Sequence, residues 1–383
     1  MKLSRTASRI QPPVFAALQT RIDELTAKGA ELIPLQIGDT HVAPPAAATD
    51  ALAALERTDA SLHRYGATAG TAELRGAIAA RLGREVDPVT EILVGNGGTH
   101  ALYCAARAVL DEGDEVILAS PYWPLAPGIF TSCGAYPVEA PLTQRLYDDP
   151  SLDPYAIFEA ARTPKTRAIY LISPNNPDGK VLSAAHLERI ADFARAHDLW
   201  VFADEVYDEV VFGERPPSIA TWPGMRERTI ELHSLSKSHA LAGIRVGYVA
   251  APAPVVALGR RVSTHSAFNV SVAMQRAALA AIADAAFPSS ACATYRDVRD
   301  QCSKALREAG LRFHEPEGAT YFFVDFGAPA LPILERAVER GVLLAPGHAF
   351  GADYANFARL CFTSVPPAKV LDGIARLAAA VRS

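Results

Sequence analysis

The sequence predicts an α/β protein: a three-layer, doubly wound, mostly parallel sheet with a smaller α+β domain at the C-terminal end. Short apolar runs alternate with amphipathic helical patterns from about residue 74 to 250. Most of these runs are apolar on both faces, as strands covered by helices on both sides must be. After about residue 285 the alternation gives way to a mixture of helical and strand-like segments, which predicts a second, smaller domain.

The predicted strands are six short apolar runs, at residues 91–94, 115–119, 167–172, 199–203, 229–233 and 245–249. Amphipathic helices lie between them. Residues 183–197, for example, place Leu187 and Ile190 at helical spacing, with Ser183 as a candidate N-cap. Strands that alternate with helices in this way are typical of βαβ units.

The C-terminal part predicts a helix near 295–309, strands at 321–326, 341–345 and 357–362, and a final amphipathic helix around 370–381. We therefore expect three parts. Residues 1–41 form an N-terminal arm and part of the small domain, residues 42–285 form the large domain, and residues 286–383 form the small C-terminal domain.

Composition and charge exclude several classes of protein. With 383 residues, 50% of them hydrophobic and 21% charged, the chain can bury a sizeable core and is not a disordered protein. A net charge of −5, with no long charged block, argues against nucleic acid or a membrane surface as the main partner. The five cysteines form no C-x-x-C pair, so we expect neither a disulfide framework nor a metal site. Without a secretory signal or a spanning helix, we expect a cytoplasmic protein.

Polar residues follow several of the predicted strands, at the edge where an open α/β sheet binds its ligands. Gly95-Asn-Gly-Gly-Thr99 opens a helix, and the free N–H groups of such a turn suit a phosphate, although a plain tight turn is the alternative. Asp204 ends a buried strand. A carboxylate there needs a cationic or hydrogen-bonding partner, and the alternative is that Asp204 caps a helix. Lys237 lies among small hydroxyl residues and could form a Schiff base, although most lysines are solvated surface groups.

Two further loops contribute at the same edge. Asn175 and Asn176 are held between prolines in a stiff loop or ordinary turn, and Tyr122 and Trp123 are core residues or rings that stack on a planar heterocycle. Together these parts meet the needs of pyridoxal 5′-phosphate: a lysine for the aldehyde, a carboxylate for the ring nitrogen, a phosphate cup and a flat neighbour. A nucleotide would explain the glycines but not the pair of Lys237 and Asp204.

At this point the sequence resembles a known family, the class I/II aminotransferases of the fold type I pyridoxal phosphate enzymes. The resemblance covers nearly the whole chain. It implies an aminotransferase that moves the α-amino group between an L-amino acid and a 2-oxo acid, with 2-oxoglutarate and glutamate as the expected couple, through an aldimine on Lys237. The most specific motifs are Asn176-Pro177 with Gly179, Asp204-Glu-Val-Tyr207, and Ser234-Leu-Ser-Lys237 with Arg245.

The resemblance also implies a role for each residue around the cofactor ring. Lys237 would form the internal aldimine and then move the proton between the substrate Cα and the cofactor C4′. Asp204 would keep the pyridine nitrogen protonated, as the partner of an electron sink. Tyr207 and Asn176 would hydrogen-bond the phenolate oxygen, and Trp123 would stack on the ring.

The remaining matches concern the substrate, the phosphate and a neighbouring subunit. Arg359 matches the arginine that grips the substrate α-carboxylate, for which a planar two-pronged donor is suited, and Gly38 and Asn176 match contacts close to that carboxylate. Tyr65 matches a residue that reaches the phosphate of the neighbouring subunit, which implies a homodimer. The other cofactor-binding positions are Gly98, Thr99, Ser234, Ser236 and Arg245.

The chain departs from the family pattern at a few positions. Asp39-Thr-His41 stands where Glu-Pro commonly follows the glycine, Asp178 replaces a usual threonine, and His100 replaces a common glutamate. We expect these residues near the substrate mouth or the cofactor rim, where they would affect side-chain specificity. Arg64, beside Tyr65, is either a ligand for a dicarboxylate side chain or a solvated arginine.

Two other functions are compatible with parts of the sequence. A lyase, cyclase or oxidase would use the same lysine and aspartate, so the motifs barely separate it from an aminotransferase. A cofactor-sensing regulator would carry an added DNA-binding domain. The acidic charge and a family pattern that begins within the first ten residues argue against such a regulator.

Overall fold

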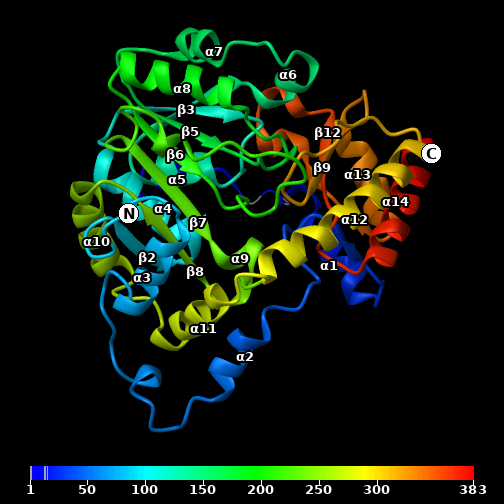
Figure 1. The fold of residues 1–383 in the computed structure, drawn as a ribbon. Helices are drawn as coiled ribbons and strands as arrows, with labels where there is room; N and C mark the ends of the chain where they lie inside the picture. Colours follow the sequence, from blue (N-terminus) through cyan, green and yellow to red (C-terminus); the bar gives the residue numbers. More distant parts are fainter. Residues whose placement is uncertain (1, 13, 15) are drawn as a thin grey trace.

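The structure is a computed structural model that describes residues 2–12, 14 and 16–383. A seven-stranded sheet forms its centre, in the order β2-β8-β7-β6-β5-β3-β4, with helices packed on both faces (Figure 1). Only β8 runs antiparallel to its neighbours β2 and β7, so the predicted mostly parallel α/β sheet is confirmed. The strands are β2 (Ile92–Asn96), β3 (Glu115–Ser120), β4 (Tyr136–Pro141), β5 (Thr166–Ile172), β6 (Trp200–Asp204), β7 (Thr229–Ser234) and β8 (Val246–Ala250).

All six strands predicted from the apolar runs are present, and no strand end differs from the prediction by more than two residues. The edge strand β4 was not predicted. It contains Pro137 and Pro141 and is only partly buried, so it lacks the continuous apolar run of the central strands. Proline is tolerated there because one side of an edge strand needs no partner for its N–H groups.

Alternate residues of the central strands face opposite helical layers. On β5, Tyr170 and Ile172 pack in the apolar cluster that contains α4 and α5, whereas Ile169 and Leu171 pack in the cluster that contains α7 and α8. The helices around the sheet are α2 (Ala46–Ala53), α3 (Ala72–Arg81), α4 (Gly97–Val109), α5 (Ala126–Ser132), α6 (Thr143–Asp148), α7 (Pro154–Ala161), α8 (Ala184–Ala196), α9 (Leu235–Ser238), α10 (Ala253–Ser266) and α11 (Val272–Ala283).

Helix α8 begins where the sequence predicts. The Ser183 hydroxyl accepts the His186 N–H, and the His186 ring accepts the Ser183 N–H, so two donors at the helix N-terminus are satisfied reciprocally.

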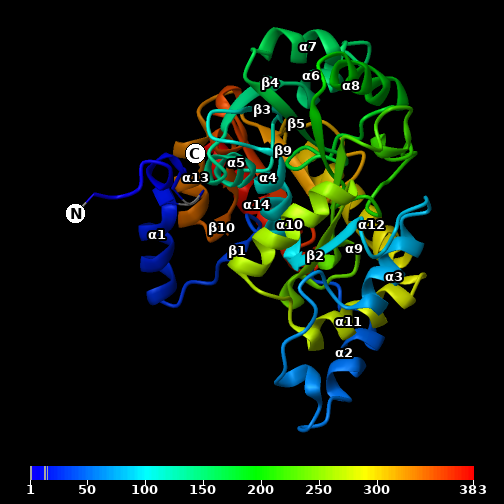
Figure 2. The ribbon, with the colours of Figure 1, turned by 90° about the vertical axis from the view of Figure 1, so that its left-hand side faces the viewer.

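The C-terminal part has its own apolar cluster, which the N-terminal segment joins. Strand β1 pairs in parallel with β10, and β11, β12 and β9 form an antiparallel sheet. Helix α1 lies beside α13 (Figure 2). The elements are α1 (Ala16–Ala27), β1 (Ile33–Pro34), α12 (Phe287–Glu308), β9 (Tyr321–Asp325), α13 (Ala330–Glu339), β10 (Val342–Leu343), β11 (Ala345–Pro346), β12 (Phe357–Cys361) and α14 (Pro367–Arg382).

Two predicted elements differ in extent from those observed. Helix α12 begins eight residues before the predicted start, because Phe287 and Pro288 already occupy its first turn. The strand predicted at 341–345 is divided into β10 and β11, which pair with different partners.

No single helix of the described residues is long and apolar enough to cross a membrane. Helices α11 and α12 meet the length and composition criteria only as a pair, bent by 78°.

Gly247 on β8 packs directly against the turn that starts α4, and a Cβ there would collide with the Gly98 backbone nitrogen. We expect Gly247→Ala to lower the free energy of unfolding by about 1–3 kcal/mol, as overpacking a core does. Urea denaturation measures the loss. Gly243→Ala is the matched control, because no atom lies within 4 Å of its added Cβ. Equal midpoints for the two variants would contradict this close packing.

Candidate active site

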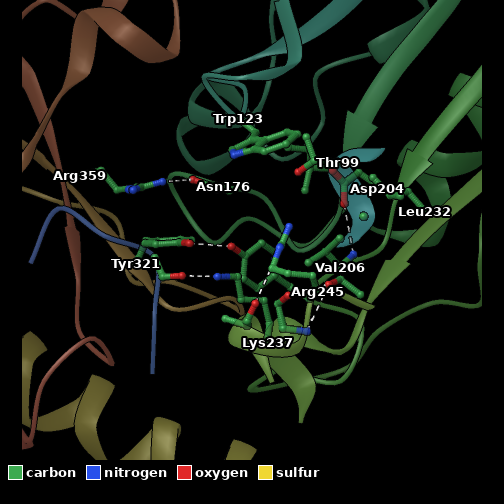
Figure 3. A pocket seen from close by; sticks show the side chains of 17 residues that line it. Thr99, Trp123, Asn176, Asp204, Val206, Leu232, Lys237, Arg245, Tyr321 and Arg359 are labelled. Atoms are coloured by element: carbon green, nitrogen blue, oxygen red, sulfur yellow. Dashed lines mark hydrogen bonds between the residues drawn. The ribbon is translucent and has the colours of Figure 1, made fainter. Parts of the chain in front are cut away.

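A pocket of about 220 Å³ lies where the parallel strands end, between the central sheet and the sheet formed by β9 and β12 (Figure 3). The structure brings together there all but one of the predicted site residues. They are Gly38, Gly98, Thr99, Trp123, Asn176, Asp204, Tyr207, Ser234, Ser236, Lys237, Arg245 and Arg359.

One end of the pocket is suited to an anion. Helix α4 points its N-terminus at it, with Gly97 at a φ of +76°. The Arg245 guanidinium packs closely against Gly97, in the space that a Cβ would occupy. The hydroxyls of Ser234 and Ser236 lie beside this helix end, 2.9 Å apart. Backbone N–H groups, a helix dipole, hydroxyls and a guanidinium are the usual ligands of a phosphate.

Asp204 lies at the end of β6 with 5% of its surface exposed. Its Oδ2 accepts the Tyr170 hydroxyl at 2.7 Å, and its Oδ1 accepts the Val206 N–H at 3.2 Å. Burial raises the pKa of Asp204 to about 6, while these two hydrogen bonds act in the opposite direction. Among the residues that the structure describes, no cationic side chain pairs with Asp204, so the pocket offers a buried carboxylate to a cationic ligand.

Lys237 lies on the short helix α9, and its Nζ donates a hydrogen bond to the Gly38 carbonyl oxygen. This contact links the large sheet to the loop that follows β1. A Cβ at position 38 would collide with the Tyr321 hydroxyl, so only glycine allows the loop to approach this closely.

Arg359 projects from β12 into the pocket, and 7% of its surface is exposed. Its Nη1 donates to Asn176 Oδ1 at 2.8 Å and its Nη2 donates to the Gln36 carbonyl at 2.7 Å. Its Nε is buried and has no partner in the described part of the chain. Such an oriented guanidinium with a donor to spare fits a ligand carboxylate.

Tyr321 is a pocket residue that the sequence did not predict. Its hydroxyl lies 2.6 Å from the Tyr207 hydroxyl, and its ring lies 4.4 Å below the Arg359 guanidinium carbon. In the sequence it looks like one more aromatic residue of a strand. Its place in the site follows from strand pairing. Tyr321 lies opposite Cys361, which is two residues from Arg359 on β12, so Tyr321 and Arg359 share a face of the sheet.

Tyr65 is the predicted residue that lies outside the pocket. The segment between α2 and α3, to which Tyr65 belongs, lies at the margin of the molecule (Figures 1 and 2). The Tyr65 side chain is 84% exposed, and its ring lies 4.8 Å from that of Phe268, which is itself 43% exposed.

The sequence predicts Asp178 at the pocket mouth or the cofactor rim, and this prediction is wrong. Asp178 is buried beneath the loop that carries Asn176. Its Oδ2 accepts hydrogen bonds from Thr143 and Gln144, and its Oδ1 accepts one from Asn175 at 2.8 Å. Burial raises the pKa of Asp178, and these donors oppose the rise. The carboxylate therefore ties the Asn175–Asn176 loop to α6.

The other three departures from the family pattern lie on loops and helix ends. The His41 ring contacts the Thr363 carbonyl, and the His100 ring accepts the Asn96 N–H and contacts Ser266. The Asp39 side chain is exposed. None of the three lines the pocket.

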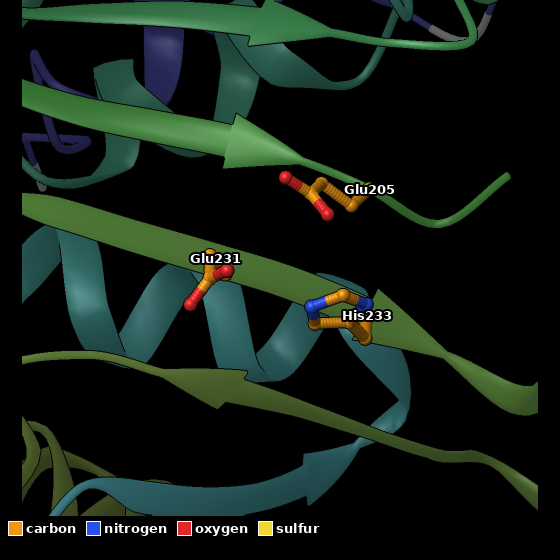
Figure 4. A group of neighbouring side chains, drawn as sticks. All are labelled: Glu205, Glu231 and His233. Carbon is orange, nitrogen blue, oxygen red and sulfur yellow. The ribbon is translucent and has the colours of Figure 1, made fainter. Parts of the chain in front are cut away.

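Glu205, Glu231 and His233 form a buried group in which ligand atoms lie within 4.8 Å of one another (Figure 4). Arg84 pairs with Glu231, and Arg215 pairs with Glu205 at 2.5 Å. Each carboxylate therefore already has a guanidinium partner, and ion pairs account for the group without a metal.

The carboxylates around His233 influence its protonation. Burial alone would lower the pKa of His233, but Asp208, whose carboxylate lies 3.3 Å from Nδ1, and the nearby Glu205 and Glu231 raise it. The imidazole is therefore held toward its protonated form.

Comparison with known proteins identifies the family. The sequence model for "Aminotransferase class I and II" matches residues 30–377. This chain belongs to the class I and II aminotransferases. It is therefore a pyridoxal 5′-phosphate-dependent aminotransferase of fold type I, an enzyme that acts on amino acids and 2-oxo acids.

Two relatives and a solved structure illustrate the similarity. An arginine–pyruvate transaminase from Pseudomonas aeruginosa is 35% identical over 87% of this chain and 86% of its own length. A probable aspartate/prephenate aminotransferase from Thermus aquaticus is 33% identical over 91% of this chain and 92% of its own length. A double mutant of aspartate aminotransferase from Thermus thermophilus superposes with a TM-score of 0.90 at 29% identity, covering 99% of this chain and 100% of that one.

The pocket residues fit the cofactor of this family. The phosphate suits the N-terminus of α4, and the buried Asp204 carboxylate suits a protonated ring nitrogen. The Lys237 amine opens into the same pocket, where an aldehyde can react with it.

The anchoring of the Asn175–Asn176 loop can be tested at Asp178. In Asp178→Asn an amide NH₂ would face donors that now bind a carboxylate oxygen. We therefore expect the free energy of unfolding to fall by about 1–3 kcal/mol, the cost of unsatisfied buried polar groups. Urea denaturation measures this loss. Asp50→Asn, at an exposed site on α2, is the control and should change little. A variant at 178 that is as stable as the control would show that the loop does not depend on this carboxylate.

Proposed function

We propose that the protein transfers the α-amino group of an L-amino acid to a 2-oxo acid at the pocket described above, with 2-oxoglutarate and glutamate as one of its couples. The observation that carries the proposal is that a lysine amine, an arginine with a free buried donor and a buried aspartate face one pocket. These groups suit, in turn, the cofactor aldehyde, the substrate α-carboxylate and the cofactor ring nitrogen.

The cofactor is held from three sides in this proposal. The start of α4, with Gly98, Thr99, Ser234, Ser236 and Arg245, binds the phosphate. Asp204 keeps the ring nitrogen protonated, and Trp123 stacks on the ring. Tyr207 and the Asn176 Nδ2 hydrogen-bond the ring oxygen, since Asn176 Oδ1 is occupied by Arg359.

Bound pyridoxal phosphate supplies an electron sink for the substrate Cα. The protein supplies the proton transfer: Lys237, once it is released from the cofactor, moves the proton between the substrate Cα and the cofactor C4′. The Gly38 carbonyl orients its Nζ, so that the base already lies near the reacting atoms.

Arg359 binds the substrate α-carboxylate and thereby sets the direction of Cα. Its two Nη groups each donate one hydrogen bond, to Asn176 and to the Gln36 carbonyl. Each Nη keeps a second N–H, so the oriented guanidinium still has donors for the ligand. The Gly38 backbone, on the loop that follows Gln36, contacts the substrate beside this carboxylate.

We also infer that the enzyme works as a homodimer. The exposed Tyr65 ring and the neighbouring Phe268 support an interface there, across which Tyr65 reaches the phosphate of the other subunit. Arg64 would then lie close to the second pocket. In the described chain, Lys237, Arg245 and Arg359 are the only cations that line the pocket, so the distal carboxylate of 2-oxoglutarate needs such a donor.

The division into an N-terminal arm (1–41), a large domain (42–285) and a small domain (286–383) also remains a proposal. The joint apolar cluster of the first and last segments supports it.

A screen of half reactions tests the proposed function. Each L-amino acid is added to the holoenzyme, and good donors should convert the visible-absorbing cofactor to the pyridoxamine form. 2-Oxoglutarate should then restore the original spectrum, and pyruvate is the comparison acceptor. Lys237→Ala serves as the blank and should show neither change.

Three results of this screen would contradict the proposal. Restoration by pyruvate alone would reject the 2-oxoglutarate couple. Release of ammonia and pyruvate, or of peroxide, without a pyridoxamine form would indicate a lyase or an oxidase. Two-way conversion in Lys237→Ala at the wild-type rate would remove that residue from its role.

The carboxylate clamp is tested by Arg359→Leu. We expect KM for amino acids to rise about 10–100-fold, because a hydrogen bond to a charged group contributes roughly 1.5–3 kcal/mol. Arg359→Lys keeps the charge but loses the planar fork, so it should recover only part of the loss. Steady-state kinetics measure both, and cofactor affinity measured by titration should change little. If KM is unaltered in both variants, the carboxylate binds elsewhere.

A further inference from the structure

Tyr170 is a buried residue that does not line the pocket but contacts Asp204, which does. It lies on β5, which pairs with β6, and 1% of its surface is exposed. Its hydroxyl donates to Asp204 Oδ2 at 2.7 Å. Tyr170 does not line the pocket itself.

The ring of Tyr170 is fixed by its surroundings. Phe130 packs against it edge-on, with ring centroids 5.5 Å apart, and the residue belongs to the apolar cluster between the sheet and α4. A hydroxyl buried in such a cluster is costly unless it has a partner. In the described structure that partner is the Asp204 carboxylate.

The two hydrogen bonds that Asp204 receives fix both of its oxygens. Val206 N–H binds Oδ1 and Tyr170 binds Oδ2, so the plane of the carboxylate is set before any ligand enters. Each oxygen can accept a second hydrogen bond. A donor that binds the ionised carboxylate also favours that form over the neutral acid.

We propose that Tyr170 is a positioning residue, which orients the Asp204 carboxylate and favours its charged form for the ring nitrogen of pyridoxal phosphate. The inference rests on the role proposed for Asp204. Tyr170 itself touches neither the cofactor nor the substrate and acts only through this one hydrogen bond.

The test compares two cofactors that differ at the ring nitrogen. The protein is freed of cofactor and titrated with pyridoxal 5′-phosphate and with its 1-deaza analogue, in which a C–H replaces the nitrogen. The quenching of tryptophan fluorescence gives each dissociation constant. The ratio of the two constants reports the contact with Asp204, because other contacts of the cofactor are common to both.

We expect the wild type to prefer pyridoxal phosphate and Tyr170→Phe to lower that preference about tenfold, the scale of one hydrogen bond to a charged group. Tyr248→Phe is the matched control. Tyr248 is also fully buried, but its hydroxyl accepts from Arg81 and does not touch Asp204, so its removal should leave the preference unchanged.

3-Fluorotyrosine at position 170 keeps the residue's shape and strengthens its hydroxyl as a donor, so the preference should rise. This variant covers the case in which Tyr170→Phe does not fold. The inference is overturned if the preference does not rise in the 3-fluorotyrosine variant. It is also overturned if Tyr170→Phe weakens the binding of both cofactors equally, because Tyr170 would then contribute only packing. A wild type without any preference would instead reject the role of Asp204, and the inference with it.

Discussion

A buried carboxylate that forms no ion pair within the described residues is the constraint on which this active site depends. Asp204 ends the central strand of the sheet and is largely buried. In the described part of the chain its carboxylate receives two hydrogen bonds, from the Tyr170 hydroxyl and the Val206 N–H. Those donors stabilise the charge in part and leave it able to attract a cation. The rest of the pocket places a helix N-terminus suited to an anion and the Lys237 amine around this carboxylate. The protein belongs to the class I and II aminotransferases.

Much of this arrangement could be predicted from the sequence, because parallel strands place polar residues at one sheet edge. Lys237 and Asp204 were found in this way. Tyr170 and Tyr321 were not, because inside a strand each looks like an ordinary core residue, and only strand pairing reveals its polar neighbour. Asp178 was misplaced because a carboxylate bound by neutral donors leaves no pattern of charges in the sequence.

Strand β7 carries residues of the pocket on one face and residues of the buried ion pairs on the other. Leu232 and Ser234 line the pocket, while Glu231 and His233, alternate residues of the same strand, belong to the buried ion pairs. The period of two along a strand turns neighbouring residues to opposite faces. A compact group of acids and a histidine can therefore lie within one or two residues of an active site and still be part of the scaffold.

The pairing of β1 with β10 has a consequence for the order in which the site forms during synthesis. The loop that bears Gly38 is held by residues near the other end of the chain: Leu35 accepts the Cys361 N–H at 2.7 Å, and His41 donates to Thr363 at 2.7 Å. A ribosome completes strand β6, which ends at Asp204, and helix α9, which carries Lys237, long before it reaches Arg359. A nascent chain can thus contain Asp204, Lys237 and Arg245 while Arg359 has not yet been synthesised, and the loop that bears Gly38 gains its hydrogen bonds to Cys361 and Thr363 only after the last strand has been made.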